Sequence, residues 1–179
     1  MELILIAMPF FAAIFENDIL WACILSWLVA QTLKILINLV VHRKFVPERL
    51  WGDGGMPSGH SATVAALAAS CGWYYGFDSV VFAITAILMI IVTHDATGVR
   101  REAGKHAVSI KLIAEVINNM VENKDEEIKT EKIKELVGHT PLQVFFGILV
   151  GVIVTVIFCA VKGVPYCGLT DNPVIFQRP

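Results

Sequence analysis

The sequence predicts an all-α integral membrane protein, a helical bundle of four to five spans with an amphipathic helical hairpin on its cytoplasmic side. The first observation is compositional: of the 179 residues, 56% are hydrophobic and only 17% are charged, whereas about a quarter of a soluble domain is charged. The second is that the apolar residues gather into runs approaching the roughly 20 residues that a helix needs to cross a bilayer. We therefore expect residues 1–179 to form a single membrane-embedded domain.

Four apolar stretches are the candidate membrane spans. They cover residues 19–41, 63–75, 77–93 and 142–161. The second is rich in alanine, and the last carries Gly147 and Gly151 four residues apart, a spacing that allows close helix packing and leaves a homodimer open. A shorter apolar segment, 1–15, follows no basic region and shows no evident cleavage site, so we expect it to stay embedded in the membrane.

Basic residues indicate how the spans are oriented. Eleven of the 14 lysines and arginines lie in two segments, 42–56 and 94–141, which are separated by two spans and so emerge on one side. The positive-inside tendency assigns that side to the cytoplasm. Residues 105–138 show an amphipathic pattern, a polar break and a second charged helix, which we interpret as a surface hairpin. A regulatory or partner-binding hairpin is the alternative. The net charge of −2 provides no basic field that would argue for nucleic acid as a partner. The apolar runs make the bilayer and a membrane lipid the expected partners.

A charged side chain inside a predicted span is a candidate functional group, because it is costly to place in lipid. Lys34 lies well inside the first span, with Gln31 before it and Asn38 after it on the same helix face. This polar stripe indicates a functional role for Lys34. The alternative is that its long stem carries the ammonium to the membrane surface.

A glycine-rich segment, 52–61, ends in Met56-Pro57-Ser58-Gly59-His60-Ser61 directly before a predicted helix. The N–H groups and the positive dipole end of a helix start favour an anion, most naturally a phosphate. His60, in the first turn, would then lie beside the anion as an acid or base. The alternative is an ordinary helix start that Ser58 caps, with His60 hydrogen-bonded to a neighbour.

A third polar segment, 94–106, begins where an apolar span ends, on the same side of the membrane as His60. Arg100 and Arg101 supply the permanent charge and paired donors that phosphate oxygens accept. His106 follows six residues after Arg100 and could face the same pocket. For this segment alone, a basic flank that contacts lipid headgroups is the alternative. Together the segments offer what hydrolysis of a lipid phosphate ester requires: cations, a nucleophile and a proton donor.

Two of these motifs carry a family resemblance. Pro57-Ser58-Gly59-His60, followed by Arg100-x5-His106, resembles the signature of the phosphatidic-acid-phosphatase type 2 (PAP2) superfamily, which includes lipid phosphatases and vanadium haloperoxidases. Residues 54–62, 95–104 and 138–141 look like the corresponding segments of its divergent PAP2 branch. The resemblance covers roughly residues 30 to 155.

The resemblance implies a division of roles among the polar residues. His106 would attack phosphorus and form a phosphohistidine, and His60 would protonate the leaving alkoxide. The residues expected to hold the phosphate are Lys34, Arg43, Ser58, Gly59, Arg100 and Arg101. The K-x6-R-P motif of the superfamily is not present, so Lys34 and Arg43 are only approximate substitutes for it.

Two departures from the superfamily pattern concern the support of the nucleophile. Val99 stands where the motif has serine, and Ile110 stands where it has the aspartate that orients the histidine. Asp95 is the candidate that takes over this catalytic role. We expect no cofactor and no metal, because phosphatases of this superfamily look metal-independent; Mg²⁺ at Asp95 is the second choice.

The activity implied by the resemblance is hydrolysis of a phosphomonoester or diphosphate headgroup at the cytoplasmic leaflet. Phosphatidylglycerophosphate, phosphatidic acid and polyprenyl phosphates fit this description. The alternative is a non-catalytic phospholipid-binding or scaffold membrane protein that keeps a PAP2-like pocket. The absence of an aspartate at Ile110 supports that alternative, whereas the presence of His106 argues against it.

Overall fold

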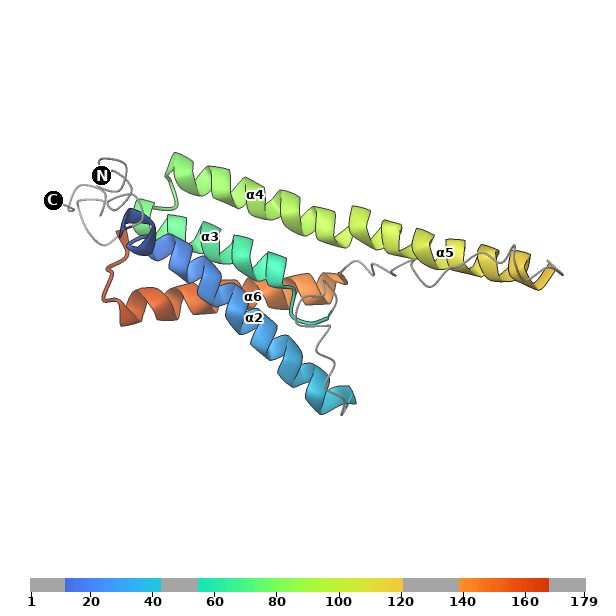
Figure 1. The fold of residues 1–179 in the computed structure, drawn as a ribbon. Coiled ribbons are helices and arrows are strands. Elements are labelled where there is room, and N and C mark those ends of the chain that lie inside the picture. The colour runs from blue at the N-terminus through green and yellow to red at the C-terminus, as the bar shows by residue number, and fades with distance from the viewer. Residues whose placement is uncertain (1–11, 43–54, 121–138, 168–179) are drawn as a thin grey trace, which may run out of the picture.

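The computed structural model describes residues 12–42, 55–120 and 139–167, and the long elements within them are all helices (Figure 1). They are α2 (Asp18–His42), α3 (Gly59–Tyr75), α4 (Val80–Thr97), α5 (Val99–Met120) and α6 (Pro141–Val161). The described residues contain no strand, which confirms the all-α prediction. Most of the segment 1–15 and the second half of the predicted hairpin, 121–138, lie outside the described residues.

Three stretches of described helix are long and apolar enough to cross a membrane. They are Asp18–Val40 in α2, Val80–Met120 over α4 and α5, and Pro141–Val161 in α6. The predicted span 63–75 falls within α3, which has 17 residues. At about 1.5 Å per residue, α3 is about 26 Å long, slightly shorter than the roughly 30 Å of hydrocarbon in a bilayer. Its many buried residues make it the inner helix of the bundle.

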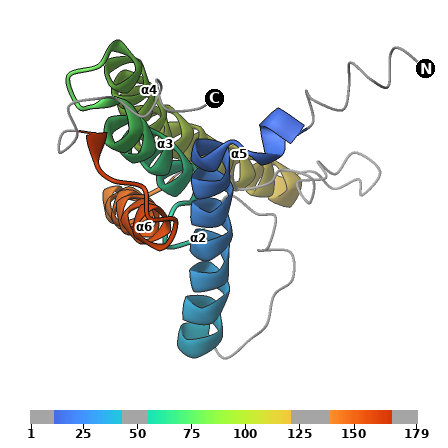
Figure 2. The ribbon, with the colours of Figure 1, turned by 90° about the vertical axis from the view of Figure 1, so that its left-hand side faces the viewer.

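α3 is the helix on which the others pack: α2, α4 and α6 each lie against it (Figure 2). It can accept three neighbours because many of its buried side chains are small, among them Ala62 and Ala66. Gly147 on α6 faces α3, and a Cβ there would lie 2.5 Å from the carbonyl oxygen of Ser58. Gly151 meets α3 equally closely, one turn further on. This glycine pair is thus used within the chain and gives no argument for a homodimer.

Polar side chains connect the inner helices. Ser26 of α2 donates a hydrogen bond through Oγ to the carbonyl of Ala62 on α3 at 3.2 Å. At the end of the bundle where α2 begins, Tyr74 donates to the Asp18 carboxylate at 3.1 Å, and Lys162 forms an ion pair with Asp18 at 3.1 Å. Such bonds hold helices together in a membrane, where burial of apolar surface between helices provides little driving force.

α5 continues α4 and extends beyond the rest of the bundle (Figure 1). Its main contacts with other described helices are with α4. Gly98 separates the two helices and has a non-helical backbone, with φ −99° and ψ −91°. The predicted amphipathic character of this region is seen in α5, where apolar side chains such as Ile113 and Met120 are exposed on one side. α5 is therefore the part of the described molecule least enclosed by its neighbours.

Candidate functional site

The starts of α3 and α6 and the end of α4 lie together at one end of the bundle. The backbone N–H of Ser58, just before α3, donates to the carbonyl of Gln143 in the first turn of α6 at 3.0 Å. The N–H of His139, just before α6, donates to the carbonyl of Ala96 near the end of α4 at 3.1 Å. Two helix starts, each with the positive end of its dipole, are therefore held beside each other.

Ser58 begins α3 by capping it, as in the ordinary alternative drawn from the sequence. Its hydroxyl accepts from the backbone N–H of Ser61 at 3.3 Å and from the Ser61 hydroxyl at 3.0 Å, and its side chain is buried. The Ser58 hydroxyl is thus engaged in starting the helix. The N–H groups of Gly59 and His60 belong to the first turn, where backbone donors have no acceptor within the helix.

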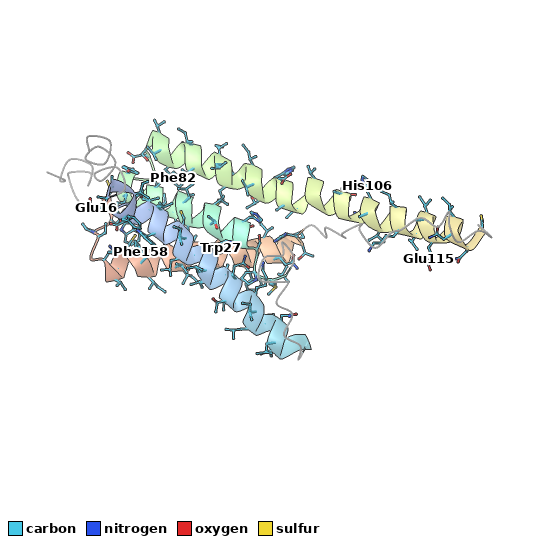
Figure 3. The ribbon with its side chains drawn as sticks, in the orientation of Figure 1. Glu16, Trp27, Phe82, His106, Glu115 and Phe158 are labelled. Atoms are coloured by element: carbon cyan, nitrogen blue, oxygen red, sulfur yellow. The ribbon has the colours of Figure 1, made fainter. Side chains whose placement is uncertain are left out.

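Side chains of α2 lie close to two glycines at the start of α3. A Cβ on Gly59 would lie 3.4 Å from Cδ1 of Trp27, the residue labelled on α2 in Figure 3. A Cβ on Gly55 would lie 3.0 Å from Cγ of Lys34, and Gly55 has a φ of +108° that other residues rarely adopt. Gly55 therefore needs to be glycine for its backbone conformation as well as for the space that it leaves to Lys34.

Lys34 is buried, with only 4% of its surface exposed, although it lies in a helix long enough to span the membrane. Asn38, one turn on, is also buried, and the Gln31 side-chain oxygen Oε1 is buried with no hydrogen-bond partner among the described residues. The polar stripe on α2 thus faces the inside of the molecule, and Lys34 does not run along an exposed helix face to the membrane surface. The Lys34 stem lies against Gly55, three residues before Ser58, so a buried cationic side chain is positioned near the start of α3.

His60 and His139 form a pair of imidazoles at the converging helix starts. Their ring centroids lie 6.4 Å apart with the rings at 76°, an edge-to-face arrangement. His60 is exposed, whereas His139 is 4% exposed and its Nε2 atom is buried. The backbone bond from His139 to Ala96 holds the buried member of the pair in place. His60 is therefore the histidine that a substrate can reach, and His139 is placed to influence its orientation.

The sequence analysis assigned His139 no role, although the residue lies in the segment 138–141 on which the family resemblance partly rests. In the structure, Thr140 and Gln143 form a capping box, and Pro141 occupies the first turn of α6. The position of His139 directly before this strong helix start was the signal that could have identified it as a site residue. Its neighbour His60 is 79 positions earlier in the chain, so sequence spacing alone could not pair them.

The other predicted site residues fall in different places. Asp95, half-buried on α4, directly precedes Ala96, whose carbonyl accepts the His139 hydrogen bond. Arg100 and Arg101 lie in the first turn of α5, next to the site end of α4, but the positions of their side chains are not described. Arg43 lies outside the described residues. The structure therefore gathers Lys34, Ser58, Gly59, His60 and Asp95 toward one end of the bundle.

His106 is not gathered with them. It is exposed on α5, on the part of the helix that extends past the bundle (Figure 3). Ile110, one turn further along α5, is 52% exposed. In this arrangement of α5, the histidine predicted as the nucleophile and the histidine predicted as the acid do not share a pocket. Among the described residues, no group of three histidine, cysteine, aspartate or glutamate side chains could hold a metal ion.

Comparison with known proteins provides a family context for this geometry. The model of the Divergent PAP2 family matches residues 15–154 of the chain. The chain is also similar to the uncharacterized membrane protein YuiD of Bacillus subtilis (strain 168), with 43% identity over 134 residues that cover 72% of this chain and 85% of YuiD. No solved structure matches the chain. Together, the apolar helices and this relative support an integral membrane protein.

Proposed function

Because the chain belongs to the divergent PAP2 family, we propose that it is a membrane lipid phosphatase that hydrolyses a phosphomonoester or diphosphate headgroup at the cytoplasmic leaflet. Phosphatidylglycerophosphate, phosphatidic acid and polyprenyl phosphates are the substrates that fit the proposal. The observation that carries it is the exposed imidazole of His60 in the first turn of α3, beside a second helix start and a second histidine. Lys34, whose buried side chain lies against Gly55 just before α3, adds positive charge at the same end of the bundle.

The proposed chemistry begins with the phosphate at the start of α3, where the Gly59 and His60 N–H groups and the helix dipole stabilise its charge. His106 attacks phosphorus, the bond to the lipid oxygen breaks, and His60 donates the proton that the leaving alkoxide needs. Water then cleaves the phosphohistidine and releases phosphate. For His106 to reach the phosphate, α5 has to bend toward α3, and Gly98 is the residue between α4 and α5 where the helix is already interrupted.

The experiment that tests the proposal is phosphate release by the purified protein from a panel of these lipids, with and without Mg²⁺. We expect release from at least one lipid, and His60→Ala should lower the rate by about 100- to 10,000-fold, the usual contribution of a general acid. His94→Ala is the matched control, because His94 is an exposed histidine on α4 that has no part in the proposed chemistry. A panel without any release, or equal losses in the two variants, would refute the proposal.

A second candidate function is non-catalytic binding of a phospholipid. It is favoured by a specific observation: His106 lies apart from His60, and Ile110 stands where an orienting aspartate is expected. A binding protein would bind phosphatidic acid in vesicles and release no phosphate from it. Inhibition by vanadate and trapping of an acid-labile phosphohistidine would separate the enzyme from the binding protein.

A further inference from the structure

One face of α3 leads from His60 toward the opposite end of the bundle. His60, Val64, Leu67 and Cys71 follow one another at intervals of four, three and four residues, which places them in a row along the helix. α2 and α4 both pack on α3 but make few contacts with each other. At the far end of the row, Leu67 and Cys71 lie beside residues of both α2 and α4. The row therefore leads along one face of α3 from the candidate phosphate site toward the opposite end of the bundle.

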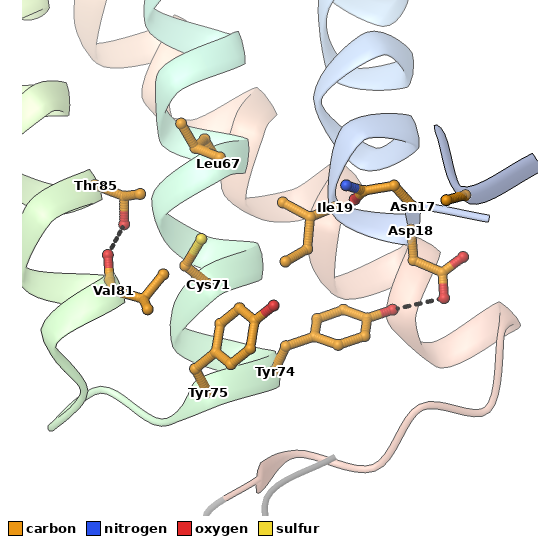
Figure 4. A pocket seen from close by; sticks show the side chains of 10 residues that line it. Asn17, Asp18, Ile19, Leu67, Cys71, Tyr74, Tyr75, Val81 and Thr85 are labelled. Atoms are coloured by element: carbon orange, nitrogen blue, oxygen red, sulfur yellow. Dashed lines mark hydrogen bonds between the residues drawn. The ribbon is translucent and has the colours of Figure 1, made fainter. Parts of the chain in front are cut away.

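A cavity of about 550 Å³ lies at the far end of this row, between the start of α2, the end of α3 and the start of α4 (Figure 4). The cavity is lined by Ala13, Asn17, Asp18, Ile19, Leu67, Cys71, Tyr74, Tyr75, Val81 and Thr85. Leu67 and Cys71 thus belong both to the row that begins at His60 and to the cavity wall. This shared face is what connects the two features.

The chemistry of the cavity walls suits hydrocarbon. Ile19, Leu67 and Val81 present aliphatic surface, and the hydroxyl of Thr85 donates back to the carbonyl of Val81 on its own helix at 3.0 Å. The polar groups gather at the far end, where the hydroxyl of Tyr74 donates to Asp18. An occupant would therefore meet apolar walls along its length and a polar boundary only at its tip.

The length of the row from His60 to Cys71 matches one lipid chain. Cys71 lies 11 residues beyond His60 on α3, which corresponds to about 16 Å at about 1.5 Å per residue. Half of the roughly 30 Å hydrocarbon core is about 15 Å, the depth that a chain from one leaflet reaches. A lipid with its phosphate at His60 would thus bring the end of its chain to Leu67 and Cys71.

We propose that the cavity is the tail site of the substrate: it receives a hydrocarbon chain of the same lipid whose phosphate is bound at His60. The proposal rests on the phosphate site of the proposed function. It identifies the substrate class as lipids with a long chain, since a short-chain phosphate would leave the cavity empty. It also sets an upper limit on the bound part of the chain, at the Asp18–Tyr74 pair.

The test is photolabelling with phosphatidic acid that carries a diazirine at the end of one acyl chain, presented in phosphatidylcholine vesicles to the purified full chain. We expect mass spectrometry to find the label on residues 67–75 and on the start of α4. Val81→Trp, which fills the cavity, should lower this label several-fold. Val80→Trp is the matched control, because Val80 is the adjacent valine, is 74% exposed and does not line the cavity.

The labelling result separates this proposal from the proposed function, because labelling requires no turnover. Cavity labelling without phosphate release would support the tail site and leave a binding protein. Phosphate release with the label spread over the exposed face of α6, or with equal labelling in the two tryptophan variants, would overturn the tail site alone. In an active protein, Val81→Trp should also raise the KM for long-chain phosphatidic acid while leaving a short-chain analogue unaffected; unchanged KM values for both would contradict the proposal.

Discussion

The contact between α3 and α6 and the junction between α4 and α5 hold their helices in opposite ways. In the first, Gly147 and Gly151 bring two backbones together, and Ser58 donates to Gln143 across the contact. In the second, Gly98 alone separates two helices, and α5 has few other described contacts. The comparison teaches that the helix starts proposed to bind phosphate belong to the tightly packed half. The half that carries His106 joins the rest of the bundle through one residue with a non-helical backbone, Gly98.

The strongest test of the packed half is to enlarge Gly147. In Gly147→Leu the new side chain would overlap the Ser58 backbone and the Ser61 side chain, neither of which is a flexible chain end. We expect a loss of about 3 kcal/mol in the free energy of unfolding, the upper range for an overpacked core. Ala160→Leu places the same leucine side chain at an exposed position on the same helix. Equal midpoints of thermal unfolding in detergent for the two variants would show that the α3–α6 contact is not tight.

The second largest effect is expected when the charge of the buried Lys34 on α2 is removed; the exposed Lys105 on α5 serves for comparison. Lys34→Met keeps the shape of the buried stem and removes its charge. We expect a tenfold to hundredfold weaker affinity for phosphatidic acid vesicles, corresponding to about 1.5–3 kcal/mol for a hydrogen bond to a charged group. The control is Lys105→Met on α5, where the exposed lysine pairs with Glu102 at 2.6 Å. Vesicle binding that falls equally in both variants would remove Lys34 from the phosphate site.

A smaller effect should follow from stiffening the junction. Gly98→Ala favours helix by about 1 kcal/mol and so opposes the bend that brings α5 to α3. We expect kcat to fall by about fivefold, which is what about 1 kcal/mol corresponds to. Ser109→Ala, at an exposed position within α5, raises helix preference away from the junction and should leave kcat unaltered. A normal kcat in Gly98→Ala would mean that no bend at this residue limits the reaction.

The smallest effect is expected from giving His106 an orienting carboxylate. Ile110 is 52% exposed, so Ile110→Asp should change stability by no more than about 0.5 kcal/mol. If His106 acts as nucleophile, the carboxylate one turn away should raise kcat by a small factor. Ile113→Asp introduces the same charge at another exposed position of α5 and should give no rise. Identical rates in the two variants would indicate that position 110 does not support the nucleophile.

The same contrast explains what could be predicted from the sequence. The helices were predictable because long apolar runs and the caps Ser58 and Thr140 are local signals. The helix that Gly147 and Gly151 face could not be predicted, because the spacing of small residues indicates close packing but does not identify the neighbouring helix. Their neighbour is α3, and not a second copy of the chain.

The site was predictable only in its local part. His60 and the helix start proposed to bind phosphate follow from a few adjacent residues, and the structure has a helix that begins there. The nearness of His139 to His60 depends on how α6 packs on α3, which only tertiary contacts determine. The distance of His106 from His60 depends on the direction of α5 after Gly98, which a motif with the right spacing does not encode.

The most direct test of the central claim, a phosphatase completed when α5 meets α3, is to identify the phosphorylated residue. The purified protein would be incubated with phosphatidic acid labelled in its phosphate, quenched in alkali and digested for mass spectrometry. The account predicts an acid-labile phosphohistidine at His106, which His60→Ala prevents from forming. Phosphate release with the label on another residue, or no phosphorylated residue and no release at all, would contradict it.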